Sequence, residues 1–337
     1  MKPLRVLVTG GAGYIGSHVV RCLRGRGHHV TVFDSLVTGH AWAVEDAELV
    51  VGDLANPEQV EAVLSGAPFD ACMNFAASIW VGESVRDPAK YYFNNTTNAL
   101  RLFGLCVRHG VERIVFSSTA AVYGEPDADL IGEDLPLRPI NPYGASKMMA
   151  ERMLADIAAA SALRYVALRY FNVAGAADDG SIGEATPDNS HLVKVACEVA
   201  MGLRPGLFIN GVDYQTPDGT CIRDYVHVED LAEAHVAALD YLVDGGESVA
   251  MNCGYGHGYS VRQVLDTVQK VVGRDLPITE GPRRAGDPPH LVASNAKIQA
   301  VLGWQPRRDD LEAIVGSAWR WEQTLDARRK QAGAASA

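Results

Sequence analysis

The sequence lacks the features that mark proteins built around metals, disulfides or membranes. Its six cysteines stand far apart, with no Cys-x-x-Cys pair and no Cys/His cluster of zinc spacing. No stretch is long and apolar enough to cross a bilayer, and Met1-Lys2-Pro3 leads into a strand pattern rather than a signal peptide. We therefore expect no metal site, no membrane partner, reduced thiols and a cytoplasmic location.

Basic patches are also missing. The net charge of −11 would repel a phosphate backbone, and no basic stripe offsets it locally. Nucleic acid is therefore not an expected partner, although a few well-placed arginines can still bind one compact anionic ligand. Hydrophobic residues make up 47% of the chain and charged residues 21%, which is typical of a folded globular protein.

The first half of the chain alternates short apolar runs with longer helical patterns. This alternation predicts βαβ units and a parallel sheet. The predicted strands are residues 5–8, 29–33, 48–51, 71–75, 113–116 and 165–168. We therefore predict an α/β fold with a Rossmann-type doubly wound parallel sheet.

The second half of the chain is less regular. Two long helices, Asp87 to His109 and Pro142 to Ala160, are predicted before Asn172, and loops rich in Gly, Pro, Asp and Asn follow it. These loops, with short helical segments between them, predict a smaller mixed α/β lobe. The predicted division is a first domain over 1–172 that also includes 226–246, a smaller lobe over 173–328, and a flexible tail over 329–337.

A glycine-rich turn follows the first predicted strand. Gly10, Gly13 and Gly16 are spaced three residues apart where the strand ends and a helix begins. Glycine permits a tight turn and the close approach of backbone amides to a pyrophosphate, and the helix N-terminus favours negative charge. The pattern alone also fits a flexible turn without a ligand, so a second signal is needed.

The second predicted strand supplies that signal because it ends in Phe33-Asp34. A carboxylate at this place accepts hydrogen bonds from the adenine ribose, an arrangement that favours NAD over its phosphorylated form. We therefore predict that the chain binds NAD. A further carboxylate, Asp53, follows the third strand, and it can either meet the adenine or cap the helix that begins near Pro57.

Tyr143 and Lys147 are the candidate catalytic pair. They stand four residues apart at the start of the second long helix, so they share one face of it. A tyrosine titrates near 10, and lowering its pKa to about 7 requires roughly 4 kcal/mol of preferential stabilisation of the phenolate. The ammonium of Lys147, together with the positive nicotinamide ring of a bound cofactor, can supply this stabilisation.

A run of hydroxyl side chains, Ser117-Ser118-Thr119, follows the fifth predicted strand. The carboxyl edge of an open α/β sheet is where ligands bind, so these hydroxyls are expected beside the tyrosine. Thr119 can orient a substrate alcohol or relay its proton. Tyr-x-x-x-Lys alone is common on amphipathic helices, but with the glycine turn and these hydroxyls it predicts an oxidoreductase-type site.

Further motifs extend the pattern beyond the cofactor domain. They are Gly13-Tyr14-Ile15-Gly16-Ser17-His18, Val81-Gly82-Glu83-Ser84-Val85, Tyr91-Tyr92-Phe93-Asn94-Asn95, Arg169-Tyr170-Phe171-Asn172, Asp218-Gly219-Thr220, Arg223-Asp224-Tyr225-Val226-His227-Val228 and Arg283-Arg284-Ala285-Gly286-Asp287. Over almost its whole length the chain resembles the extended short-chain dehydrogenase/reductase superfamily. Within that superfamily it is similar to the UDP-glucose 4-epimerase family.

This resemblance implies that Tyr143 is the base, Lys147 its electrostatic partner and Thr119 the assisting hydroxyl. Tyr143 would take the proton of the C4 hydroxyl of UDP-galactose or UDP-glucose while NAD takes the C4 hydride, which leaves a 4-ketose tethered through its nucleotide. The ketose would turn over and receive the hydride on its other face. The resemblance therefore implies an isomerase whose NAD stays bound and needs no recycling.

The resemblance also implies two sets of binding residues and two partners. The NAD set is Gly10, Gly13, Tyr14, Ile15, Gly16, Asp34, Asp53, Leu54, Phe75, Ala76, Ala77, Asn94, Ser117, Tyr143, Lys147 and Tyr170. The set for the UDP-sugar is Thr119, Tyr143, Asn172, His191, Leu192, Asn210, Arg223, Tyr225, Arg284, Asp287 and Leu291. In the second set Arg223 and Arg284 would contact the diphosphate and Asp287 a ribose hydroxyl. The two long helices resemble those that pair in the family's homodimer.

Four positions depart from the family pattern. Ile79 replaces a lysine near the cofactor phosphates, His191 replaces an asparagine, and Asn210 stands where a phenylalanine usually precedes the glycine. Leu291 stands where the family varies a side chain beside the second sugar carbon, and a leucine there instead of a tyrosine leaves room for an N-acetyl group. The substrate therefore stays open between a UDP-hexose, a UDP-N-acetylhexosamine and a UDP-pentose.

Other functions remain to be weighed. A dehydratase of the same superfamily would need an acid and a base after Thr119, where Ala120-Ala121 stand instead. A net oxidoreductase would have to exchange its cofactor at each turnover. A non-catalytic NAD-binding sensor would keep the glycine turn but would not need Tyr143 and Lys147. The sequence therefore favours an epimerase.

Overall fold

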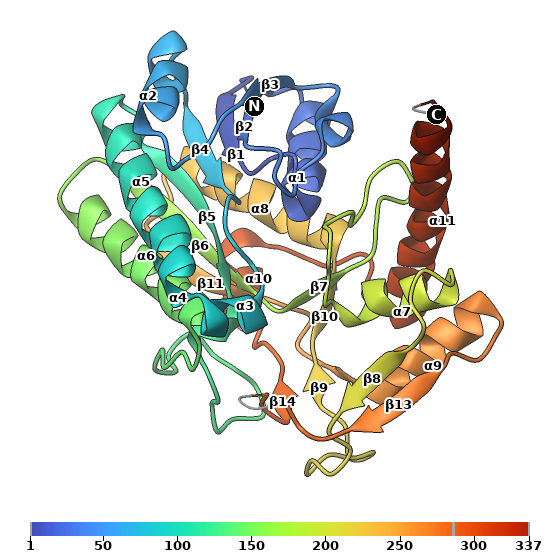
Figure 1. Ribbon diagram of the computed structural model, residues 1–337. Helices are drawn as coiled ribbons and strands as arrows, with labels where there is room; N and C mark the ends of the chain where they lie inside the picture. Colours follow the sequence, from blue (N-terminus) through green and yellow to red (C-terminus); the bar gives the residue numbers. More distant parts are fainter. Residues whose placement is uncertain (1, 285–286, 336–337) are drawn as a thin grey trace.

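The computed structural model describes residues 2–284 and 287–335, and its centre is a parallel sheet of seven strands (Figure 1). The strand order is β11-β6-β5-β4-β1-β2-β3. The bounds are β1 (Arg5–Thr9), β2 (His29–Asp34), β3 (Glu48–Val51), β4 (Ala71–Asn74), β5 (Arg113–Thr119), β6 (Arg164–Tyr170) and β11 (Val249–Cys253). This arrangement confirms the predicted doubly wound α/β fold, and all six predicted strands are present.

Helices cover both faces of this sheet. One face packs against α1 (Tyr14–Gly25) and α8 (Val228–Val243), and the other against α2 (Pro57–Gly66), α5 (Asn98–Arg108) and α6 (Pro142–Ala159). Apolar residues line both faces of the strands because a parallel sheet between two helical layers is buried on each side. The carboxyl ends of the strands are therefore left free to form a ligand site.

The long helix predicted over Asp87 to His109 is interrupted. It consists of α4 (Pro88–Tyr91), a π-helical turn over Tyr92–Thr97, and α5. Asp87 begins this run by accepting a hydrogen bond from the backbone N–H of Lys90, at 3.2 Å. The π-helical turn brings Asn94 and Asn95 toward the carboxyl ends of the strands, where Asn95 donates to the carbonyl oxygen of Ser78 at 2.9 Å.

The segment that returns to the large lobe is longer than predicted. The predicted return covered residues 226–246, and α8 lies within it. The seventh strand, β11, follows at Val249–Cys253 and pairs in parallel with β6. Its pattern was missed because Val249 and Ala250 are only half-buried at the edge of the sheet, so the strand has no strict apolar alternation.

The small lobe consists of short elements joined by loops (Figure 1). Its helices are α7 (Leu192–Ala200), α9 (Val261–Val272) and α11 (Leu311–Ala335). Its strands are β7 (Asn172–Ala174) with β10 (Tyr225–His227), β8 (Leu207–Asn210) with β13 (Ile278–Gly281), and the set β12 (Tyr259–Ser260), β9 (Ile222–Arg223) and β14 (His290–Leu291). The shorter helix α3 (Val81–Arg86) lies in the connection from β4 to β5, and α10 (Ala296–Leu302) packs against β11 and α8 of the large lobe.

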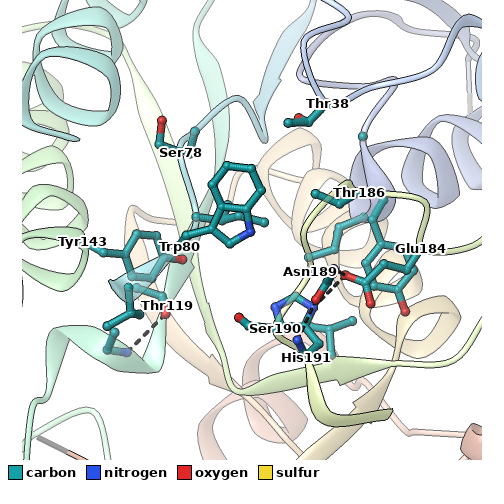
Figure 2. A pocket seen from close by; sticks show the side chains of 18 of the residues that line it. Thr38, Ser78, Trp80, Thr119, Tyr143, Glu184, Thr186, Asn189, Ser190 and His191 are labelled. Atoms are coloured by element: carbon teal, nitrogen blue, oxygen red, sulfur yellow. Dashed lines mark hydrogen bonds and ion pairs between the residues drawn. The ribbon is translucent and has the colours of Figure 1, made fainter. Parts of the chain in front are cut away.

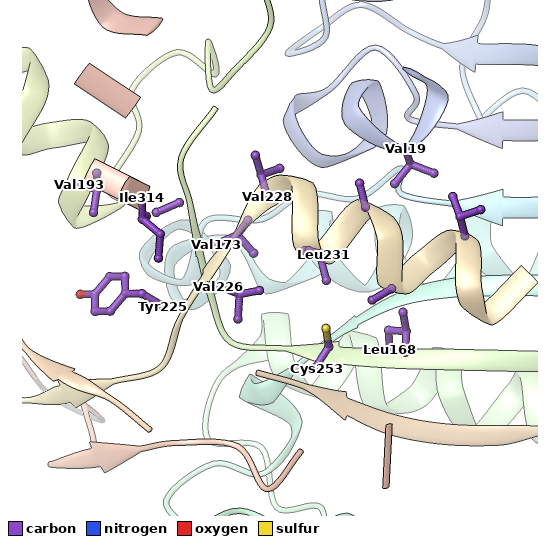
Figure 3. Packing of buried hydrophobic residues seen from close by; sticks show 14 of the residues in the cluster. Val19, Leu168, Val173, Val193, Tyr225, Val226, Val228, Leu231, Cys253 and Ile314 are labelled. Atoms are coloured by element: carbon purple, nitrogen blue, oxygen red, sulfur yellow. The ribbon is translucent and has the colours of Figure 1, made fainter. Parts of the chain in front are cut away.

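One hydrophobic cluster continues from the large lobe into the small lobe. Figure 3 shows Val228 and Leu231 on α8 between Leu168 of the sheet and Ile314 of α11. All four side chains are fully buried. The two lobes therefore share a core.

The carboxyl-terminal helix extends through the segment that was predicted to be a flexible tail. α11 continues to Ala335, and residues 336 and 337 of the predicted tail lie outside the described residues. Arg329, Lys330 and Gln331 are strong helix formers, and Lys330 pairs with Asp326 one turn earlier at 2.6 Å. Helix propensity thus extends the helix without any burial of these side chains.

Candidate active site

A single large cavity, of about 1310 Å³, lies between the two lobes at the carboxyl ends of the strands. It contains every residue predicted to bind cofactor or substrate except Lys147. Those residues are Gly10, Gly13, Tyr14, Ile15, Gly16, Asp34, Asp53, Leu54, Phe75, Ala76, Ala77, Asn94, Ser117, Thr119, Tyr143, Tyr170, Asn172, His191, Leu192, Asn210, Arg223, Tyr225, Arg284, Asp287 and Leu291. The fold therefore brings the two predicted sets into one continuous space.

The glycine turn forms one end of this cavity. Gly10 has φ +70, and a Cβ there would lie 2.5 Å from the backbone N of Ala76. A Cβ on Gly16 would lie 2.3 Å from the carbonyl oxygen of Gly10, so the helix could not pack on the strand. No side chain caps the first turn of α1 in the described part of the chain, and its free N–H groups fit a pyrophosphate.

Asp34 lies beside this turn at the end of β2. Its carboxylate accepts hydrogen bonds from the backbone N–H groups of Ala12 and Leu36, at 2.9 and 2.8 Å. These bonds hold the carboxylate in the cavity wall, where an adenine ribose would meet it. Asp53 also lines the cavity, and the alternative role considered for it, the cap of α2, is filled by Asn56.

Tyr143 faces the middle of the cavity from the first turn of α6. Asn141 caps this helix by accepting the backbone N–H of Gly144 at 2.9 Å, which fixes the position of Tyr143. Burial raises the pKa of Tyr143 above its ordinary value, and a hydrogen bond with Thr119 partly offsets that rise. The chain without a cofactor thus holds Tyr143 as a neutral phenol beside the Thr119 hydroxyl.

Lys147 lies directly behind the tyrosine rather than in the cavity wall. Its Nζ donates to the carbonyl oxygen of Ser117 at 2.7 Å and lies 4.9 Å from the centre of the Phe116 ring. Burial lowers the pKa of Lys147 to about 7, and the negative charge of Glu151 opposes that effect. A negative charge that enters the cavity would therefore raise the pKa of Lys147 and favour its charged form.

The hydroxyl run at the end of β5 divides between two tasks. Ser117 shares a hydrogen bond of 2.7 Å with the Tyr170 hydroxyl, and both residues line the cavity. Ser118 points the other way and donates to the buried carboxylate of Glu151, which also pairs with Arg169 at 2.6 Å. Because successive side chains of a strand point to opposite faces, Ser117 and Thr119 line the cavity while Ser118 points into the core.

Arginines line the opposite end of the cavity. Arg223 donates to the carbonyl oxygens of Ile222 and Pro288, both at 2.7 Å, and forms an ion pair with Asp287. Arg284 also lines the cavity, whereas Arg283 pairs with Asp213 at 2.7 Å and stacks on Tyr214. Two guanidinium groups, Arg223 and Arg284, are therefore available at the end where the sequence predicts a diphosphate. Ala285 and Gly286 of the same motif lie outside the described residues.

Several residues of the cavity wall were missed in the sequence, and three of them are Glu184, Asn189 and Trp80 (Figure 2). Glu184 and Asn189 contact His191 on the side of the cavity opposite Tyr143 and Thr119, and Trp80 lies between the two sides. The indole N–H of Trp80 is inaccessible to solvent and has no hydrogen-bond partner among the described residues. These residues reach the cavity only through the folding of the loops that carry them, so no local sequence pattern indicates them. Burial of an acidic side chain such as Glu184 in an irregular loop is unusual.

The described residues contain no group of three or more His, Cys, Asp and Glu side chains arranged to hold a metal ion. Across residues 2–284 and 287–335, none of the helices has both the length and the apolar character that a membrane span requires.

Comparison with known proteins gives a consistent result over nearly the full length. Residues 6–254 match the model of the NAD dependent epimerase/dehydratase family. The UDP-glucose 4-epimerase of Azospirillum brasilense is 55% identical over 98% of this chain and 95% of the relative. The crystal structure of UDP-glucose 4-epimerase from Brucella ovis in complex with NAD has a TM-score of 0.92 at 45% identity, covering 94% of this chain and 97% of that one.

A third similar protein has a broader name. The UDP-Glc/GlcNAc 4-epimerase from Campylobacter jejuni has a TM-score of 0.85 at 47% identity, covering 95% of this chain and 99% of that one. These levels of identity and coverage confirm the resemblance that the sequence motifs indicated. The chain belongs to the NAD dependent epimerase/dehydratase family, and within it to the UDP-glucose 4-epimerases.

Proposed function

We propose that this chain is an NAD-dependent UDP-glucose 4-epimerase that interconverts UDP-galactose and UDP-glucose. The observation that supports this most strongly is the single cavity, which extends from the glycine turn past Tyr143 and Thr119 to Arg223. A cavity of this extent has room for a dinucleotide and a nucleotide sugar end to end. Because the sugar would lie in the middle, its C4 would face Tyr143.

The residues of the chain support the proton steps of this reaction. When bound, NAD supplies an acceptor for the C4 hydride and later returns it, so the overall reaction needs no external redox partner. Tyr143 takes the proton of the C4 hydroxyl, and Thr119 holds that hydroxyl in line with it. To accept this proton Tyr143 must first be a phenolate, and Lys147, which lies buried behind Tyr143 on the same helix face, stabilises that phenolate through its charge.

The opposite end of the cavity would hold the nucleotide while the sugar turns over. We assign the diphosphate to Arg223 and Arg284, because guanidinium groups bind phosphate oxygens in pairs. We assign a ribose hydroxyl to Asp287, which then exchanges part of its ion pair with Arg223 for the ligand. Asn172 and Tyr225 lie on adjacent strands of the same wall, β7 and β10.

A second substrate class is supported by Leu291. Its side chain lines the cavity on β14, beside Arg223 in the parallel pairing with β9. A leucine there is smaller than a tyrosine and leaves space for an N-acetyl group at the second sugar carbon. The Campylobacter jejuni relative, which is named for both UDP-Glc and GlcNAc, supports this second substrate class.

Conversion of UDP-galactose without added NAD tests the proposal. We expect purified protein to form UDP-glucose, with the sugars identified by NMR. We expect Tyr143→Phe to lose about 10²-fold to 10⁴-fold in kcat while keeping its NAD, because it removes one proton-transfer group. The exposed Tyr92 offers a matched control, and Tyr92→Phe should keep full activity. Failure of folded, NAD-loaded wild-type protein to convert any UDP-sugar would refute the proposal.

We also propose that the chain forms a homodimer through the helical run α4 to α5 together with α6. Phe93 and Leu100 of that run and Met149 of α6 are 49%, 44% and 40% exposed, which is high for apolar side chains on helices that otherwise pack well. Sedimentation at micromolar concentration should show a dimer, and a monomer would contradict this part. The five buried thiols and the half-buried Cys22 are all free, which fits the cytoplasmic location that we propose.

A further inference from the structure

His191 has an acidic partner that no motif indicated. Its Nδ1 lies 2.6 Å from Oε1 of Glu184, and the side chain of Glu184 is only 7% exposed whereas that of His191 is 43% exposed toward the cavity. Asn189 completes the group: its amide donates to Glu184, and its oxygen accepts the backbone N–H of His191 at 2.6 Å. Figure 2 shows these three residues on one wall, facing Tyr143 across the cavity.

The carboxyl-terminal helix holds Glu184 in place. The indole N–H of Trp321 on α11 donates to the carbonyl oxygen of Glu184 at 2.9 Å. The neighbouring Gly183 lies so close to Trp321 that a Cβ there would lie 2.5 Å from the indole. The buried carboxylate is therefore fixed by packing against α11, and it can in turn fix the imidazole.

Which atom donates in the hydrogen bond between His191 and Glu184 determines whether His191 can donate a second hydrogen bond to a ligand. A carboxylate only accepts hydrogen bonds, so Nδ1 of His191 must carry a proton. In a neutral imidazole with its proton on Nδ1, the other nitrogen, Nε2, presents a lone pair and would repel a phosphate oxygen. Only the imidazolium presents an N–H at Nε2. His191 can therefore donate to an anionic ligand only in its charged form.

Several other charged groups of the small lobe are paired with one another. Lys194, one turn along α7, pairs with Glu322 of α11 and lies 3.5 Å from Glu198. Arg204 pairs with Glu198 and donates to the carbonyl oxygen of Asn189 at 3.0 Å. Arg223, which also lines the cavity, pairs with Asp287.

Three further titratable groups lie on the surrounding elements. Tyr14 of α1 donates to the carbonyl oxygen of Gly175 at 2.6 Å, and burial raises the pKa of Cys197 on α7 to about 12, which keeps its thiol neutral. His40 reaches the carbonyl oxygen of Ala185 at 3.3 Å. Glu184 is thus the charge that acts most directly on His191.

Two further observations agree with a charged His191. Burial by itself would lower the pKa of His191, but the charge and hydrogen bond of Glu184 outweigh burial and raise it above the ordinary value. His191 is also the residue before α7, and no side chain caps that helix among the described residues. The first turn of α7 therefore has backbone N–H groups free for an anionic ligand next to His191.

We propose that Glu184 is a positioning residue that keeps His191 as an imidazolium, so that His191 donates Nε2–H to the diphosphate of the bound UDP-sugar. This inference rests on the proposed function, because it takes the anionic group to be that diphosphate. Binding of the nucleotide sugar is then coupled to one proton on this pair. The proton transfer at Tyr143 is separate from it.

The pH dependence of KM and kcat for UDP-glucose tests this inference. UDP-glucose is a suitable probe because its esterified diphosphate lacks the phosphomonoester ionisation near pH 6. In the wild-type holoenzyme we expect KM to rise severalfold, up to about tenfold per pH unit, above the pKa of His191, with kcat following a different profile. In Glu184→Gln, which keeps the acceptor oxygen but removes the charge, we expect this rise to begin at a lower pH.

Two variants make the experiment decisive. His191→Asn has an amide donor that does not titrate, so its KM should stay nearly constant between about pH 6 and pH 8.5. Glu280→Gln removes an exposed carboxylate of the same lobe and should leave the profile of KM as in the wild type. Identical KM profiles for wild type and Glu184→Gln would overturn the inference, whereas an inactive wild type would refute the proposed function instead.

Calorimetry keeps the inference falsifiable if the Glu184 variant does not fold. UDP-glucose binding to the wild-type holoenzyme, measured in two buffers of different ionisation enthalpy, should show proton uptake above the pKa of His191. The uptake should disappear in His191→Asn. Equal uptake in the wild type and in His191→Asn, or no uptake in either, would contradict the coupling.

Discussion

The two ends of the cavity are built in different ways. At the cofactor end, the wall is backbone: Gly10 and Gly16 pack so closely that a single Cβ would overlap neighbouring main-chain atoms. At the nucleotide-sugar end, the wall consists of charged side chains, with Arg223 paired to Asp287 and His191 paired to Glu184. We expect the first end to recognise its ligand by shape and peptide dipoles, and the second by the charges of its side chains.

This difference has a functional meaning. A site made of backbone has little freedom to vary, which suits a cofactor that stays bound through every turnover. Side-chain pairs can be replaced one at a time, which suits a site that must release its ligand and select among related sugars. Substitutions at the two ends should therefore separate the two modes of binding.

The largest effect is expected from Gly16→Ala at the cofactor end. The new Cβ would lie 2.3 Å from the carbonyl oxygen of Gly10, so α1 must move away from β1 and the pyrophosphate site must open. We expect NAD retained on purification to fall to less than about a tenth of the wild-type content, with loss of activity. The measurement is cofactor content by absorbance after denaturation, together with the melting temperature.

The same helix provides the control for this prediction. A Cβ on Gly25, in the last turn of α1, would meet no heavy atom within 4 Å, so Gly25→Ala should keep its NAD. Alanine is also the better helix former by about 1 kcal/mol, so this variant should be no less stable. Full NAD content in Gly16→Ala would show that the cofactor end tolerates side chains and would remove the contrast between the two ends.

A smaller effect is expected from Arg223→Gln at the opposite end. The change removes a charged donor that is 10% exposed and leaves Asp287 without its partner. We expect KM for UDP-galactose to rise about tenfold to 100-fold, because hydrogen bonds to charged groups contribute about 1.5–3 kcal/mol, while NAD content stays unchanged. Steady-state kinetics on NAD-loaded protein measure this.

Arg283 gives the matched arginine. It pairs with Asp213 outside the cavity wall, so Arg283→Gln should change KM by less than about twofold. If both arginine variants gave the same KM, the assignment of the diphosphate to Arg223 would be wrong.

The smallest effect on the hexose reaction is expected from Leu291→Tyr. The larger ring would fill the space beside the second sugar carbon, so we expect kcat/KM for UDP-N-acetylglucosamine to fall more than about tenfold. The value for UDP-glucose should change by less than about threefold. Leu291→Met conserves volume and serves as the control. A parallel loss for both sugars would show that Leu291 does not select between them.

The sequence predicted the large lobe well because its signals are local. Each of the six expected strands is a short apolar run, and the glycine turn and Asp34 stand at the strand ends that the pattern required. The seventh strand was missed because half of β11 is only partly buried, and the extension of α11 to Ala335 was missed because it depends on helix propensity rather than on an apolar face.

The small lobe shows why the rest could not be predicted. Glu184 is seven residues before His191 in an irregular loop, and neither helical nor strand periodicity connects them. Their contact arises only when Gly183 packs on Trp321, which lies far away along the sequence on α11. The resemblance to a family placed His191 at the substrate, but the state of its imidazole depends on this packing.

The hydrophobic cluster that joins the lobes through α8 has one more consequence. With Val228 and Leu231 fully buried between the sheet and α11, a hinge motion that separated the lobes would have to expose these side chains to water. The rim of the cavity is accessible at both ends, since the lining residues Phe208 and Val37 are 64% and 79% exposed. The shared core thus leaves the rim of the cavity, rather than a hinge between the lobes, as the route by which substrate replaces product.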